Sequence, residues 1–150
     1  MGHFVQAFVG PRIVLDLVQR RYSASLVIAL SQDLWLLPML DDLYDAIPNE
    51  GSTDSIGEHF QFLTPKVIAL LKDFSQTNAV AYFETEYFGG TGNQGAVLAK
   101  NGQIIFGPQN GDGTINDMLR MMGVQKGQAF DEFEVVGLGR CRSNEEWLRQ

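Results

Sequence analysis

The chain has 150 residues, a net charge of −7, and 45% hydrophobic and 19% charged residues. This length suits one domain that buries roughly two-thirds of its unfolded surface, and the composition excludes a disordered chain. The negative charge disfavours nucleic acid and anionic membranes as partners and favours a basic protein.

The sequence predicts a cytoplasmic protein. Its one cysteine, Cys141, excludes an internal disulfide and fits a reducing compartment. The first residues lack the basic and apolar regions of a signal peptide. The longest apolar stretch, residues 24–40, contains Asp33 near its middle, so we expect no membrane span.

The first third of the chain predicts alternating short strands and helices. Residues 4–9 favour a strand, and the spacing of apolar residues over 12–22 favours a helix. Residues 25–38 favour two short buried strands joined at 31–33. Pro38 predicts the start of a helix that ends near Ile47.

The clearest loop is 48–58, which is rich in glycine and small polar residues. A domain boundary there would leave a first piece of roughly 50 residues, too small for a good core. The sequence therefore predicts one domain over residues 1–150, with 48–58 as an internal loop.

The remaining chain predicts three helices and three strands. Thr64-Pro65, Thr114 with Asp117, and Ser143 with Glu146 are typical helix starts. Residues 79–88 favour a strand, and Asn101-Gly102 predicts a hairpin over 95–106 because a type I′ turn needs positive φ at both central residues. The elements mix without strict βαβ alternation, so we expect an α+β fold: a mostly antiparallel sheet with amphipathic helices packed on it.

The stretch "FGGTGNQGAV" contains the spacing Gly90-x-Gly92-x-x-Gly95 of a dinucleotide-binding loop. Such a loop needs a helix directly after it, because the amides of the helix N-terminus hold the pyrophosphate. Here the hairpin follows instead. We therefore expect no nucleotide site; residues 89–95 should form a wide turn between antiparallel strands.

Other cofactor and catalytic motifs also fail. Aligning "NGDGTIND" with a calcium loop places Pro108 and Leu119 at the two terminal ligand positions, where carboxylates are required. His3, His59 and Cys141 show no zinc spacing and no nucleophile motif. We expect no cofactor, no metal site and no catalytic residue of these kinds.

Strand 79–88 carries the one constellation with possible chemistry. Alternation places Tyr82, Glu84, Glu86 and Phe88 on one face, and we expect the opposite face, with Phe83, to contact the core. Two glutamates two residues apart lie about 7 Å from each other along a strand. They suit the acid–base pair of an inverting glycosidase, a divalent metal with further ligands from elsewhere, or an ordinary solvated face.

A third interpretation is recognition of a protein partner. Aromatic side chains supply contact area and carboxylates supply selectivity for a basic surface. The predicted partner-binding residues are Tyr82, Glu84, Glu86, Tyr87, Phe88, Asn93 and Gln94.

The runs "AYFETEYFGGTGNQGAV", "INDMLRMMGV" and "DEFEVVGLGRCRSNEEW" resemble small bacterial immunity proteins that are encoded beside polymorphic or contact-dependent toxins. The resemblance covers about residues 79–147 and rests on a Tyr/Phe-x-Glu-Thr-Glu/Asp-Tyr-Phe-Gly-Gly pattern. It implies a non-enzymatic cytoplasmic protein that binds and blocks one cognate toxin. The alternatives are a small hydrolase that uses Glu84 and Glu86, and an accessory subunit of a larger complex.

Overall fold

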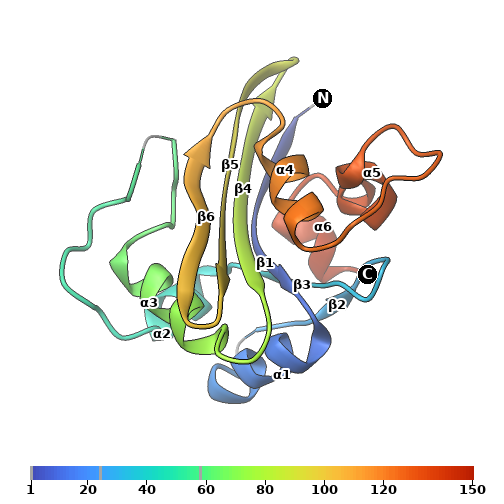
Figure 1. The fold of residues 1–150 in the computed structure, drawn as a ribbon. Coiled ribbons are helices and arrows are strands. Elements are labelled where there is room, and N and C mark those ends of the chain that lie inside the picture. The colour runs from blue at the N-terminus through green and yellow to red at the C-terminus, as the bar shows by residue number, and fades with distance from the viewer. Residues whose placement is uncertain (1, 24, 58) are drawn as a thin grey trace.

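The computed structural model describes residues 2–23, 25–57 and 59–150. Its centre is a six-stranded antiparallel sheet in the order β2-β3-β1-β4-β5-β6 (Figure 1). The strands are β1 (His3–Gly10), β2 (Ile28–Ala29), β3 (Trp35–Pro38), β4 (Val80–Phe88), β5 (Thr91–Lys100) and β6 (Gln103–Asn110). The chain is one α+β domain, as the sequence predicts.

Helices cover both faces of this sheet. They are α1 (Arg12–Arg21), α2 (Asp41–Ala46), α3 (Pro65–Phe74), α4 (Thr114–Met121), α5 (Glu132–Val136), the 3-10 turn η1 (Leu138–Arg140) and α6 (Asn144–Leu148). One core lies between the sheet and α1, α2 and α3, and a second lies between the sheet and α4, α5 and α6 (Figure 1). The sheet is therefore the middle layer of three.

The two-sided cover corrects the predicted faces of β4. Every residue from Val80 to Thr85 is buried, so β4 has a core on each side over most of its length. Tyr82 belongs to the first core and Phe83 to the second. The prediction of a single core face with Phe83 was wrong, because the helices on the Tyr82 side come from the N-terminal half of the chain.

Both predicted hairpins are present. Asn101 and Gly102 have φ angles of 55° and 75°, as the turn chemistry requires. Gly95 lies inside β5, so the prediction that a strand and not a helix follows the glycine stretch is confirmed. The turn before β5 is shorter than predicted, since only Gly89 and Gly90 separate β4 from β5.

The later glycines of that stretch serve close packing rather than a turn. A Cβ atom at Gly92 would meet the main-chain oxygen of Glu86 and lie 2.6 Å from the Cα of Tyr87. A Cβ at Gly95 would lie 2.5 Å from the ring of Phe60. Gly92 therefore requires glycine because main-chain atoms leave no room for a Cβ, and a side chain at Gly95 would displace Phe60; neither reason involves a ligand.

One predicted helix start was also wrong. Pro38 is the last residue of β3, and the amide of Met39 donates to Gln6 O, so pairing with β1 delays α2 until Asp41. The helix predicted from Thr114 is confirmed as α4, but Gly113, with a φ angle of 78°, takes the N-cap position, so Thr114 makes no side-chain cap. At the C-terminus, Ser143 caps α6 as predicted by accepting from the amide of Glu146.

The edge strand β6 is irregular. Its register with β5 shifts between Ala96 and Leu98 and again between Leu98 and Ala99. As a result Ile104 packs on the first core and Phe106 on the second. Pro108 lies within the same strand.

Candidate functional site

The end of the β4–β5 hairpin projects beyond the helices that cover the sheet (Figure 1). We call residues 86–94 the distal hairpin. Glu86 and Phe88 are exposed there, Phe88 to 61%. Tyr87, Asn93 and Gln94 are half-buried. Five of the seven predicted partner-binding residues therefore lie in the distal hairpin, with Glu86 and Phe88 the exposed ones.

Phe88 is supported from one side. Its ring lies 6.2 Å from the ring of Phe4 on β1, and Phe4 stands opposite Glu86 in the sheet register. Pairing of β4 with both β1 and β5 holds this part of the strand in place. A large apolar side chain is thus presented to solvent on an ordered support, next to a carboxylate.

Tyr82 and Glu84 lie elsewhere, and their prediction as surface contacts was wrong. Tyr82 is fully buried, with its ring 5.1 Å from that of Phe8, and Glu84 is 4% exposed. The Tyr82 hydroxyl donates to Glu84 Oε2 at 2.5 Å. The two residues form part of the base on which the distal hairpin stands.

The Glu84 carboxylate anchors a neighbouring segment. Oε1 accepts from the amide of Gln61 at 2.5 Å, and Oε2 accepts from the amide of Phe62 at 2.8 Å. Burial raises the pKa of Glu84, while these hydrogen bonds oppose the shift. A raised pKa meets one requirement of an acid–base catalyst. However, both oxygens are already occupied, and neither glutamate lines any of the three cavities described below.

A small cavity of about 210 Å³ lies on the opposite face of the distal hairpin. Its polar groups bond mainly to one another. Gln94 joins two elements, since its Nε2 donates to Tyr87 Oη at 3.0 Å and its Oε1 accepts from the amide of Ile115. Asn116 donates to Asp131 at 3.2 Å and accepts from the amide of Phe133. The network connects β5, α4 and α5 and so fixes the hairpin against the second layer of helices.

His3 lies in the same cavity as a neutral imidazole. Its Nδ1 is 2.6 Å from Thr85 Oγ1, which also accepts from the amide of Val5, and its Nε2 is 3.4 Å from Leu138 O. These partners assign the proton to Nε2, because the Leu138 carbonyl can only accept and the Thr85 hydroxyl is then left to donate to Nδ1. Burial lowers the pKa of His3 below its usual value.

This environment predicts that the protein loses stability in mild acid. A histidine with a lowered pKa contributes stability above its unfolded pKa of about 6.5, and this contribution is lost as the pH falls through the folded pKa. We expect the free energy of unfolding to fall more steeply between pH 7.5 and 5 in the native protein than in His3→Asn. His59→Asn is the control, since asparagine tolerates the positive φ of that position. Equal slopes for the native protein and His3→Asn would contradict the assignment.

Cys141 does not form a reactive dyad with this histidine. The thiol is 2% exposed, and burial raises its pKa. A nucleophilic cysteine needs the opposite shift, because the thiolate is the reactive form. Cys141 packs in the second core as a small apolar side chain.

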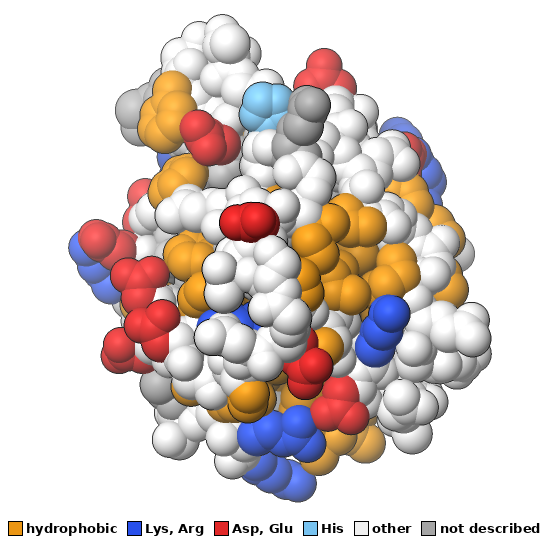
Figure 2. All heavy atoms as spheres, turned by 90° about the vertical axis from the view of Figure 1, so that its left-hand side faces the viewer, with side chains coloured by type: hydrophobic (Ala, Val, Ile, Leu, Met, Phe, Trp, Pro, Cys, Tyr) orange, Lys and Arg blue, Asp and Glu red, His pale blue; other side chains and the backbone are white. Residues whose placement is uncertain are grey.

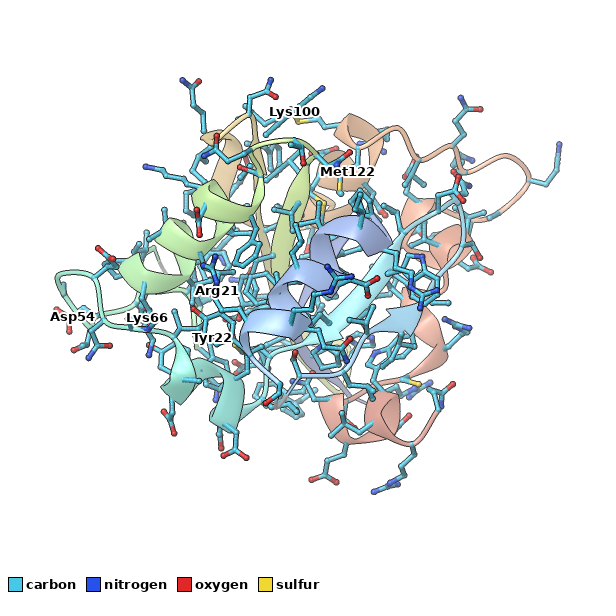
Figure 3. All side chains as sticks on the ribbon, turned by 90° about the horizontal axis from the view of Figure 1, so that it is seen from below. Arg21, Tyr22, Asp54, Lys66, Lys100 and Met122 are labelled. Atoms are coloured by element: carbon cyan, nitrogen blue, oxygen red, sulfur yellow. The ribbon has the colours of Figure 1, made fainter. Side chains whose placement is uncertain are left out.

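A second cavity of about 210 Å³ lies between α1 and α3, where Arg21, Tyr22 and Lys66 lie on one side of the molecule (Figure 3). Lys66 is 6% exposed, and its Nζ donates to Tyr44 O at 2.6 Å and Ile47 O at 3.1 Å. It also lies 3.9 Å from the centre of the Tyr44 ring. These contacts complete the C-terminal end of α2, which is a structural role for a buried ammonium.

The largest of the three cavities, about 500 Å³, was missed by sequence reasoning. It is formed by β1, the start of α2, residues 61–62 and the start of α6. These four segments lie far apart in the chain, and hydrogen bonds of Asn144 to Gln6 and Met39 join three of them. Only the charges of Asp41 and Glu145, both exposed, could have marked it in the sequence.

Comparison with protein-family models, with curated proteins and with solved structures finds no match to this chain. Within the described ranges, no helix is both long and apolar enough to cross a bilayer. The same residues contain no group of three or more His, Cys, Asp or Glu side chains placed to hold a metal ion. The resemblance to immunity proteins stays a prediction, so the function is argued from the geometry.

Proposed function

We propose that this protein is an immunity-type protein that binds and neutralises one cognate bacterial toxin by forming a stoichiometric complex. The observation that carries the proposal is Phe88, a 61% exposed aromatic side chain beside exposed Glu86 on an anchored, projecting hairpin. Buried aromatic anchors with polar neighbours dominate the binding energy of protein interfaces. The proposed contact surface is the distal hairpin, with Glu86, Tyr87, Phe88, Asn93 and Gln94.

Charge supports a basic partner. The net charge is −7, and acidic side chains gather on one flank of the face that carries segment 47–64 (Figure 2). On α2, Asp41, Asp42 and Asp45 are all exposed. An acidic surface accelerates encounter with a basic toxin domain, and this acceleration weakens as salt screens the charges.

Rigidity also supports the proposal. The network through Gln94 and the anchored segment at Glu84 hold the distal hairpin before any partner arrives. A preordered contact surface loses less conformational entropy on binding than a mobile one. Such a surface suits a protein that must block its toxin durably, since affinity differences between related complexes lie mostly in the dissociation rate.

The test begins by searching the neighbouring genes for a toxin with a variable C-terminal domain, and uses that domain as the ligand. Phe88→Ala is expected to raise the Kd of the complex with the toxin domain at least about 30-fold, as for an interface hot spot worth about 2 kcal/mol. Calorimetry measures this Kd. Ile13→Ala is the control: Ile13 is 64% exposed, but on α1 at the opposite end of the sheet (Figure 1). The Kd of the Ile13→Ala variant for the toxin domain should match that of the native protein.

Co-expression of this chain with the toxin domain tests whether the protein is an immunity protein. Cells that produce the toxin domain should survive with the native chain and lose that protection with Phe88→Ala. If they die as readily with the native chain as without it, and no complex survives gel filtration, the immunity proposal is wrong.

A further inference from the structure

The cavity of about 500 Å³ continues the surface of the distal hairpin. Phe4 connects the two, because its ring contacts Phe88 on one side and lines the cavity on the other. Gln6, two residues further along β1, also lines the cavity and points to the same face of the strand as Phe4. A molecule that covers Phe88 therefore has this cavity beside it.

Gln6 has an unmet hydrogen-bonding group. The residue is 4% exposed, and its Oε1 lies 3.4 Å from Asn144 Nδ2, which donates to it. Its Nε2 has no hydrogen-bond partner among the described residues. A buried donor without a partner costs free energy that an acceptor brought by a ligand would recover.

Two carboxylates contribute the charge of the cavity. Asp41 lies in the first turn of α2 and is exposed. Glu145 on α6 is 82% exposed and has Arg149 at 3.5 Å, an exposed pair of the kind that contributes little free energy. A cationic group of a partner can therefore engage both acids at small cost.

We propose that this cavity binds an arginine residue of the protein partner. Gln6 Nε2 is itself shielded from solvent, so the Gln6 side chain turns toward the cavity and then donates to a main-chain carbonyl of the partner. The aliphatic part of the arginine side chain packs on Phe4 and Phe62, and the guanidinium reaches Asp41 and Glu145. Arginine fits better than lysine, because its five donors in a planar fork can serve two carboxylates together. The identity of the partner as a protein rests on the proposed function.

The test titrates the protein with N-acetyl-arginine N-methylamide, which carries both the side chain and main-chain carbonyls, and follows amide signals by NMR. The Gln6 side-chain amide and the main-chain amides of residues 143–145 should shift saturably. The citrulline analogue, which lacks the charge, should bind at least about fivefold more weakly. Gln6→Met should weaken binding of the arginine probe about tenfold.

Asp41→Asn should weaken binding of the arginine probe severalfold. Because Asp41 is exposed, this variant still tests the proposal if Gln6→Met fails to fold. Asp45→Asn, which removes an exposed acid of the same helix outside the cavity, is the matched control and should bind as the native protein does. The proposal is overturned if the citrulline analogue binds equally well. It is also overturned if Asp41→Asn leaves the affinity unchanged, or if a second copy of the chain occupies the cavity in a solution dimer.

The result is separable from the proposed function. If the toxin domain binds and depends on Phe88 while the arginine probe does not bind, the cavity assignment fails alone. If the probe binds at Gln6 but the neighbouring toxin domain is not bound, the immunity proposal fails and the cavity remains a site for basic residues.

Discussion

Glu84→Ala is expected to lower the free energy of unfolding by about 3–5 kcal/mol, because three donors lose their acceptor at once. The amides of Gln61 and Phe62 and the hydroxyl of Tyr82 all donate to this carboxylate. Alanine supplies no acceptor, and Tyr82 is fully buried, so water cannot replace the lost bond there without disturbing the core. The segment around Phe62 should loosen first.

Urea unfolding measures this effect. Glu84→Gln keeps the shape but places an amide group against backbone donors, so we expect an intermediate loss of about 1–3 kcal/mol. Glu86→Gln is the matched control, two residues further along the same strand and exposed, and should change stability by less than about 0.5 kcal/mol. If Glu84→Ala were as stable as Glu86→Gln, the anchoring role would be disproved, and the hydrolase alternative would regain weight.

Trp147→Ala is expected to cost about 3–5 kcal/mol, the range for removing a large side chain from a core. Trp147 on α6 is fully buried in the second core, and its ring lies 5.2 Å from the Arg140 guanidinium. Its indole nitrogen has no hydrogen-bond partner among the described residues. The loss is therefore one of packing.

The measurement is again the unfolding free energy, with two comparisons. Trp147→Phe keeps most of the volume and should cost clearly less than alanine. Leu148→Ala, at a neighbouring position that is 38% exposed, should cost about 1 kcal/mol or less. Since α6 also lines the cavity at Asn144 and Glu145, Trp147→Ala should weaken the arginine probe as well. A loss below about 1 kcal/mol would mean that α6 is not part of the cooperative core.

Local signals in the sequence predicted most of the secondary structure. Asn101-Gly102 defines its hairpin because few residues tolerate positive φ twice in succession, and Ser143 defines the start of α6 through its own side chain. Both signals act within four residues. The wrong helix start at Pro38 came from the same reasoning, since pairing of β3 with β1 is a contact between distant segments.

The site was only partly predictable for a related reason. Alternation along β4 correctly separated the face of Glu86 and Phe88 from that of Tyr87. Alternation could not show how far along β4 the segments from residues 1–78 cover this face. Glu84 lies under that cover and is buried, whereas Glu86 lies beyond it and is exposed. The cavity around Gln6 depends on four distant segments, so no local pattern in the sequence indicates it.

The irregular strand β6 has a consequence for how this protein meets others. A regular open edge offers a row of amides and carbonyls that a strand from another chain can extend, which leads to filaments and aggregates. Here the two register shifts break that row, and Pro108 contributes no amide to it. The opposite edge, β2, has only two residues. The protein is thus protected against strand addition at both sides of its sheet, and selectivity for a partner is left to side chains.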